Sequence, residues 1–151
     1  MQIRVDDLSG REIRALLAEH LQSMHRLSPP ESVHALDLAG LLRPEITFWT
    51  IWDGEELLGC GALKEVSASH GEVKSMHTAE NARRRGVATA LMRQLLAAAR
   101  QAGLTRLSLE TGSWDYFEPA RAFYRRHGFR ECAPFAHYRV DPNSVFMTRE
   151  L

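Results

Sequence analysis

The sequence predicts a mixed α/β fold in which helices flank one sheet, and two patterns carry this prediction. Residues 46–52 and 57–66 are rich in β-branched and aromatic residues, and the Asp-Gly pair between them is typical of a hairpin turn. Further on, the strand-like run 72–78 is followed by apolar residues at helical spacing and then by a second strand-like run, 104–111. Because a helix separates these two runs, they should lie parallel, joined by a right-handed crossover.

The segments before the hairpin read as one strand and two helices. Residues 2–5 alternate as in a strand, and residues 8–25 carry apolar side chains at helical spacing. Two prolines, at positions 29 and 30, end this helix. Residues 32–42 predict a second, shorter helix, and the histidines of this region, including His20 and His34, are expected on helix surfaces.

The remaining segments complete the fold. In the crossover, Ala88, Leu91 and Leu95 mark the apolar face of the helix. A short helix from Phe117 should stop at Gly128, and residues 129–132 and 144–148 predict closing strands. The 151 residues show no linker or break in composition, so residues 1–151 are expected to form a single domain.

Composition and charge exclude several classes of function. Nineteen basic residues balance nineteen acidic ones, which argues against nucleic acid as the main partner. The apolar runs are too short to cross a bilayer and no signal-peptide pattern is present, so no membrane association and a cytoplasmic location are expected. The two cysteines, Cys60 and Cys132, lack metal-ligand and redox spacing. They are expected to be buried thiols, and no metal site is expected.

A loop with three arginines and a glycine precedes the crossover helix. The first turn of a helix has backbone N–H groups without intrahelical partners, and the helix dipole adds positive charge there. Gly86 leaves the backbone open to an approaching anion, and Ala88 keeps the next turn small. The junction therefore predicts a phosphate-binding site. It lacks the Gly-Lys-Ser/Thr of a P-loop and the several glycines of a dinucleotide fingerprint.

Two motifs resemble those of the GNAT superfamily of N-acetyltransferases. Arg83, Gly86 and Ala88 fill the family's acyl-CoA loop, Gln/Arg-x-x-Gly-x-Gly/Ala, and residues 120–129 are similar to its Ala-x-x-hydrophobic-Tyr-x-x-x-Gly-Phe signature. The resemblance covers the whole chain and points to a bacterial branch. It implies a mostly antiparallel central sheet whose parallel pair splays apart to admit acetyl-CoA, the co-substrate. The cofactor-binding residues that it implies are Met76, His77, Thr78, Arg83, Arg84, Arg85, Gly86, Val87, Ala88 and Thr89.

The resemblance also implies the chemistry, in which a primary amine attacks the thioester directly through a tetrahedral intermediate. Tyr124 matches the family's general acid, which protonates the leaving CoA thiolate. An amine that is protonated at neutral pH needs a base, and Glu72, at the start of the central strand, is the first candidate. Glu110, on the neighbouring strand, is its rival, and a chain of waters is the third possibility.

The acceptor amine is left open by the sequence. A small molecule is the leading expectation, with Glu110, Trp114 and Tyr138 as candidate substrate contacts. A peptide or protein amino terminus is the alternative substrate. A non-catalytic acetyl-CoA sensor is the alternative from a different class, and nucleic-acid binding ranks last. Monomer and homodimer are equally compatible with the sequence.

Overall fold

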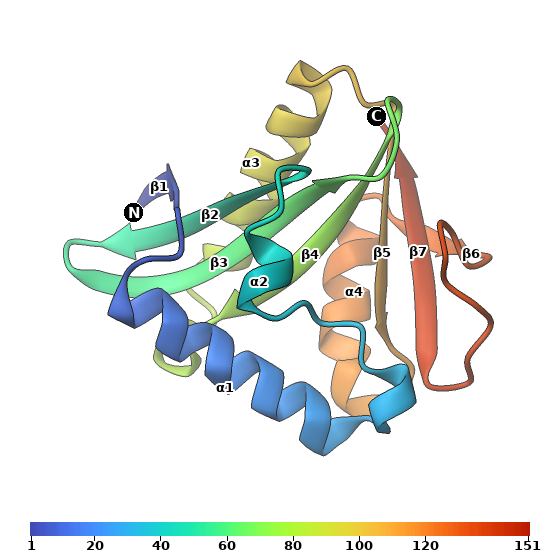
Figure 1. The fold of residues 1–151 in the computed structure, drawn as a ribbon, viewed down its shortest axis with the longest axis horizontal. Helices are drawn as coiled ribbons and strands as arrows, with labels where there is room; N and C mark the ends of the chain where they lie inside the picture. Colours follow the sequence, from blue (N-terminus) through green and yellow to red (C-terminus); the bar gives the residue numbers. More distant parts are fainter.

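A seven-stranded mixed sheet forms the centre of the computed structural model, which describes residues 1–151. The order of the strands across the sheet is β1-β2-β3-β4-β5-β7-β6, and the parallel pair β4–β5 is the one exception to antiparallel pairing (Figure 1). The strands are β1 (Gln2–Val5), β2 (Ile46–Asp53), β3 (Glu56–Glu65), β4 (His70–Thr78), β5 (Arg106–Gly112), β6 (Arg130–Cys132) and β7 (Ser144–Glu150).

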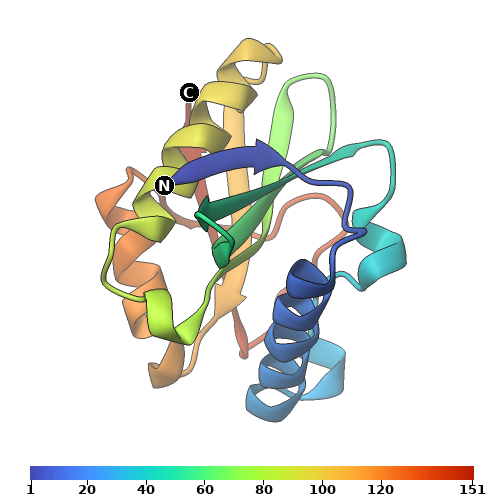
Figure 2. The ribbon, with the colours of Figure 1, turned by 90° about the vertical axis from the view of Figure 1, so that its left-hand side faces the viewer.

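Helices cover both faces of this sheet, as Figure 2 shows. The helix α1 (Arg11–Leu27) lies on one face, and α3 (Val87–Gln101) and α4 (Glu118–Arg126) lie on the other. The larger core cluster joins α3 to the sheet, with Leu91, Leu95 and Leu107 fully buried. A smaller cluster joins α1 and the short helix α2 (Leu38–Leu41) to β2 and β3. The expected sheet with flanking helices is confirmed.

The parallel strands β4 and β5 pair over three residues and then separate. Their register runs from His70–Arg106 to Glu72–Ser108 and goes no further, although β4 continues to Thr78. Beyond that point β4 carries a bulge, because Gly61 of β3 has no single partner there and Ser75 of β4 has a positive φ of 53°. A bulge bends its strand and increases the local twist. The resulting opening lies beside α4 (Figure 1).

The segment 32–42 is less helical than its sequence predicts. Pro30–Ser32 forms a single 3-10 turn, η1, and the only α-helical part is the one-turn helix α2, capped by Asp37. Residues 33–37, between them, form neither helix nor strand, and the backbone carbonyl of His34 accepts a hydrogen bond from Lys74 Nζ at 3.0 Å. A tertiary contact has therefore replaced the helical hydrogen bond.

Three smaller differences separate prediction from structure. The helix α1 begins at Arg11, after the approach of residues 8–10 in which Leu8 has a positive φ of 66°, and it continues to Leu27, two residues beyond the expected end at His25. Val87 rather than Ala88 begins the buried stripe of α3. Cys60 is buried as expected, but Cys132, at the end of the short edge strand β6, is only partly covered; both are free thiols.

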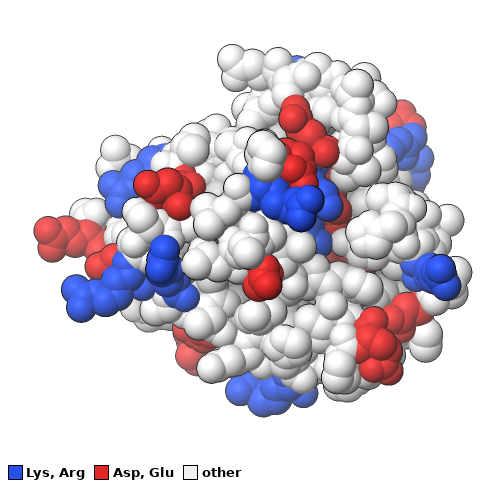
Figure 3. Space-filling model, in the orientation of Figure 1, with Lys and Arg blue, Asp and Glu red and all other residues white.

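Charge is dispersed over the surface. Figure 3 shows basic and acidic side chains interspersed on one face of the molecule, with no continuous basic stripe. This agrees with the equal numbers of basic and acidic residues in the chain. No helix is long and apolar enough to cross a membrane.

Candidate active site

Two cavities meet where β4 and β5 separate. The smaller, about 230 Å³, lies on the α1 side of the opening and is lined by residues of α1, η1, β4 and β5. The larger, about 630 Å³, lies on the α4 side and reaches the loop before α3. Tyr124 lines both cavities, and the other residues common to the two are Met76, His77, Arg83, Tyr116, Phe117 and Ala120. A group bound in one cavity therefore faces a group bound in the other across Tyr124.

The loop before α3 has the geometry of an anion site. Arg84 and Gly86 have positive φ values of 63° and 79°, and no side chain caps the helix, so the first-turn N–H groups remain available. A Cβ added at Gly86 would point into open space, with no atom within 4 Å. This is the backbone geometry that binding of a phosphate at the junction requires, and the arginines of the loop add positive charge.

The three arginines of this loop differ in their surroundings. Arg83 lines both cavities and Arg84 lines the larger one. Arg85 instead contacts the β2–β3 hairpin, where its guanidinium lies 3.2 Å from Asp53 and 3.8 Å from Glu56. Its side chain ties the loop to the hairpin.

Of the other predicted cofactor-binding residues, some line the larger cavity and some do not. The larger cavity is lined by Met76, His77, Thr78 and Ala88. Val87 is buried beneath the loop, and Thr89 follows in the first turn of α3 without lining either cavity.

Glu72 lies deep in the smaller cavity and forms part of a buried polar cluster. Its Oε2 accepts a hydrogen bond from the Tyr138 hydroxyl at 2.5 Å and lies 3.3 Å from Lys74 Nζ. Lys74 Nζ also donates to the Tyr138 hydroxyl and to the His34 carbonyl, each at 3.0 Å. The side chains of Glu72, Lys74 and Tyr138 are all nine-tenths or more buried. We call these three residues the Glu72–Lys74–Tyr138 cluster.

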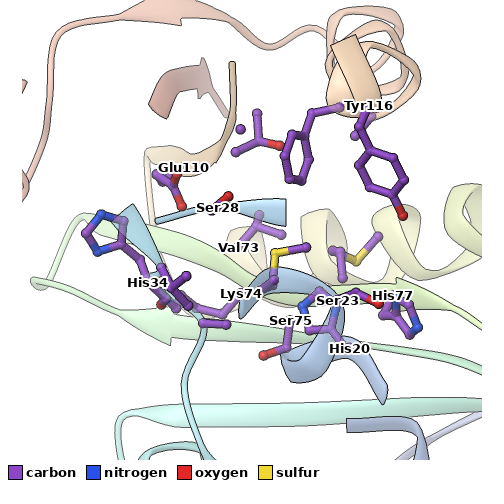
Figure 4. A pocket seen from close by; sticks show the side chains of 18 of the residues that line it. His20, Ser23, Ser28, His34, Val73, Lys74, Ser75, His77, Glu110 and Tyr116 are labelled. Atoms are coloured by element: carbon purple, nitrogen blue, oxygen red, sulfur yellow. The ribbon is translucent and has the colours of Figure 1, made fainter. Parts of the chain in front are cut away.

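Glu110 has a different environment on the neighbouring strand. It lines the smaller cavity, forms no ion pair with a basic residue, and is labelled in Figure 4 across the cavity from His77. Burial raises the pKa of its carboxyl from the ordinary 4.5 to about 7, and the Ser144 hydroxyl beside it offsets part of this effect. A carboxylate with a pKa near neutrality is suited to accept and release a proton at that pH.

Tyr124 stands between the cavities with its hydroxyl protected from ionisation. Burial, and secondarily the charge of Glu110, raise the pKa of this phenol above its ordinary value. The side chain packs edge-to-face against Phe123 and Phe129. The phenol is therefore protonated at neutral pH and can act there as a proton donor.

His20, which the sequence assigned to no site, contacts His77, one of the predicted cofactor-binding residues, in the lining of the smaller cavity. His20 of α1 and His77 of β4 have ring centroids 4.7 Å apart (Figure 4). Burial lowers the pKa of each to about 4, and the positive charge of Arg83 contributes at His77. Both rings are therefore neutral at pH 7. The helical stripe predicted for α1 contains His20, but nothing in the sequence indicates that β4 crosses beneath it.

The candidate substrate contacts are separated by the fold. Glu110 faces the cavity, and Tyr138 reaches it through its hydrogen bond to Glu72. Trp114 is 43% exposed, lines neither cavity, and donates from Nε1 to Asn143 Oδ1. Ser32 closes this side of the site, because its hydroxyl donates to Asp141 and links η1 to the loop of residues 133–143.

Comparison with known proteins identifies the family of the chain. The model of the acetyltransferase (GNAT) family matches residues 12–129. The chain belongs to the GNAT family. It is 55% identical, over the full length of both chains, to the uncharacterised N-acetyltransferase YsnE of Bacillus subtilis. It is therefore an acetyltransferase, as its two sequence motifs predicted.

Solved GNAT structures agree with the fold. A Klebsiella pneumoniae protein described as an acyl-CoA N-acyltransferase superposes with a TM-score of 0.80 at 28% identity, covering 99% of this chain and 97% of that one. A Bacillus subtilis acetyltransferase in complex with CoA superposes with a TM-score of 0.69, covering 99% and 98% of the two chains. At 17% identity, this second likeness is one of fold.

Proposed function

We propose that this GNAT enzyme transfers the acetyl group of acetyl-CoA to the primary amine of a small molecule. The observation that carries the proposal is the meeting of two cavities at Tyr124. The larger cavity ends at the loop before α3, whose free N–H groups and arginines suit the pyrophosphate of acetyl-CoA. A protein with this fold was solved in complex with CoA, which supports acetyl-CoA as the co-substrate.

In this proposal the smaller cavity binds the acceptor. Its volume, about 230 Å³, is below the usual range for drug-sized ligands and suits a compact amine. The hydrogen bond between Ser32 and Asp141 joins two chain segments over this side of the site. A peptide amino terminus would need a groove along which the rest of the chain could leave, so a small molecule is the preferred acceptor.

The acetyl transfer then needs two proton movements. The amine nitrogen attacks the thioester carbon, the C–N bond forms, and the C–S bond breaks. We assign the amine proton to Glu110, because its carboxylate is not held by a basic residue and has a pKa of about 7. Glu72, the first candidate from the sequence, offers a weaker case, since its Oε2 already accepts from Tyr138 and Lys74.

Tyr124 supplies the proton that the departing thiolate takes. Its pKa is raised, so the hydroxyl is present as the acid when the C–S bond breaks. Glu110 and Tyr124 are close enough for the charge of one to affect the pKa of the other. An acceptor that arrives as an ammonium loses two protons on becoming an amide. Glu110 takes the first and releases it to solvent, and the second replaces the proton that Tyr124 gives to the thiolate, so both groups are restored.

The test is an acetyl-CoA consumption assay over a panel of amines, amino acids and short peptides. Thiol release that depends on a small amine, with the acetylated amine found by mass spectrometry, supports the proposal. Acetylation of peptide amino termini alone would move the assignment to that class of acceptor. Binding of acetyl-CoA without consumption across the whole panel would support the sensor.

A further inference from the structure

The Glu72–Lys74–Tyr138 cluster has no part in the proton movements just described. A buried ion pair is a poor source of stability, since removing two charges from water costs about as much as their attraction returns. The cluster nevertheless lies at the deep end of the acceptor cavity, with Glu72 and Lys74 in its lining. Because two of its residues line this cavity, the cluster can contact a bound acceptor.

The hydrogen bonds show which atoms of the cluster remain available. Lys74 Nζ has three protons and three acceptors within the protein: Glu72, Tyr138 and the His34 carbonyl. It has no proton left for a substrate carboxylate. Glu72 accepts both of its hydrogen bonds at Oε2, and Oε1 has no partner within the protein. The cluster therefore offers the cavity an acceptor and no donor.

The charges decide which donor fits there. The ammonium of Lys74, 3.3 Å from Glu72, cancels the negative charge of the carboxylate. A second ammonium at Oε1 would be repelled by Lys74, with no further negative charge to offset this repulsion. A substrate carboxylate at the same place would be repelled by Glu72. An uncharged hydroxyl or amide N–H donates to Oε1 without either penalty. The reacting amine, by contrast, can arrive as an ammonium because Glu110 compensates its charge.

The distance between the two carboxylates sets the length of the acceptor. Glu72 pairs with Ser108 across the parallel strands, and Glu110 is two residues further along β5 on the same face. Two residues of a strand rise about 7 Å and neighbouring strands lie about 4.8 Å apart, so the Cα atoms of Glu72 and Glu110 are separated by about 8–9 Å. An extended chain of about four carbons, with a hydrogen bond at each end, fits between the two carboxylates.

We infer that Glu72 Oε1 binds an uncharged hydrogen-bond donor at the far end of the acceptor, so that the enzyme selects small amino alcohols or amino amides over diamines and amino acids. This inference rests on the proposed function, since it takes the smaller cavity as the acceptor site. Lys74 and Tyr138 act as positioning residues, which hold Glu72 and neutralise it. Glu72 and Lys74 together then set the charge that the cavity tolerates.

The experiment compares four amines of equal length that differ at the far end. These are 4-amino-1-butanol, butylamine, 1,4-diaminobutane and 4-aminobutyrate. For the wild-type enzyme we expect kcat/KM to be highest for the amino alcohol and at least about tenfold lower for the diamine and the amino acid. Equal kcat/KM for all four would overturn the inference and leave the proposed function standing. No acetylation of any small amine, with acetylation of peptides, would refute both.

Two variants test the charge balance in opposite directions. Glu72→Gln leaves Lys74 uncompensated, so the ratio of kcat/KM for 4-aminobutyrate to that for the diamine should rise by about tenfold or more. Lys74→Met leaves Glu72 uncompensated, and the same ratio should fall. Shifts in the same direction, or none, would refute the cancellation of charge.

Controls separate this effect from a general loss of structure. Glu131→Gln removes a carboxylate from the exposed side of β6 and should leave the ratio unchanged. The double variant Glu72→Gln/Lys74→Met removes both charges and should restore the wild-type ranking. If a single variant does not fold, the wild-type ranking still decides, because a preference for a charged far end contradicts the inference.

Discussion

Replacement of Glu110 by glutamine is the perturbation that tests the proposed chemistry most directly. Glutamine keeps the size of the side chain and loses the ability to accept the amine proton. We expect the single-turnover rate of acetyl transfer to fall by roughly 10²–10⁴-fold at pH 7, the usual range for a lost general base. Acetyl-CoA affinity should change little, since Glu110 does not line the larger cavity.

The pH dependence gives the expected profile. The pKa of Glu110 is about 7, so about half of the carboxylate is ionised at pH 7 and about a tenth at pH 6. The wild-type kcat/KM should rise about tenfold per pH unit below 7 and then level off, because the ammonium form of the acceptor is productive once Glu110 is ionised. The variant must use free amine, so its rate should keep rising toward the pKa of the amine. The difference between the two enzymes should therefore shrink at high pH.

The same group predicts a change in stability. Between pH 4.5 and 7 the native Glu110 binds more protons than the unfolded one, so the free energy of unfolding falls as the pH rises through this window. A rise in pKa from 4.5 to about 7 corresponds to about 3 kcal/mol once the carboxyl is fully ionised. Glutamine does not ionise. The variant should therefore be more stable than wild type by up to about 3 kcal/mol at pH 8 and should show no such gain at pH 4.

Denaturant unfolding at pH 4 and pH 8 measures the change in stability, and single-turnover kinetics measures the change in rate. Glu131→Gln is the control for loss of an exposed carboxylate. A Glu110→Gln enzyme with the wild-type pH profile would refute the assignment of the base. If Glu72→Gln instead shows the loss at neutral pH and the continued rise, Glu72 is the base.

Three further substitutions test other parts of the site. Gly86→Val should abolish acetyl-CoA binding, measured by calorimetry. Gly103→Val is the control, because Gly103 has a φ of 81° and equally open surroundings, so this variant should carry the same backbone strain and still bind acetyl-CoA. Equal affinities of the two variants would show that the loop is not part of the site. Tyr124→Phe should slow single-turnover transfer by roughly 10²–10⁴-fold. A wild-type rate would make Tyr124 a packing residue. Gly59→Ala should lower the melting temperature, because its Cβ would lie 2.8 Å from the backbone oxygen of His77; an unchanged value would show that the bulge can adjust.

Local patterns were sufficient to predict most of the fold. The hairpin, the crossover helix and the motif around Tyr124 are contiguous in sequence, so their residues carry their own conformational preferences. The parallel pair follows from the crossover alone. The segment 32–42 is the main failure. Its helical preference is overridden by the hydrogen bond from Lys74 to the His34 carbonyl, which no local pattern reveals.

The parts of the candidate site that are contiguous in sequence could be predicted, and the parts assembled from distant segments could not. The loop before α3 is one continuous segment, and its positions could be named individually. The acceptor cavity is assembled from distant segments: His20 meets His77, and Tyr138 meets Glu72. The sequence showed Glu72 as a carboxylate at a strand end, but not the partners that occupy its Oε2. Lys74 was missed because an alternating strand residue gives no sign that it is buried.

The hydrogen bonds that close the acceptor cavity have a consequence for the order of folding. The bond between Glu72 and Tyr138 spans 66 residues, and the bond between Ser32 and Asp141 spans 109. Loop closure over such separations is entropically costly and slow, whereas the turn and helix from Arg83 to Gln101 depend on local contacts. During synthesis the phosphate-binding loop should therefore form well before the acceptor cavity. On the proposed function, the enzyme can therefore select its amine only when nearly the whole chain is in place.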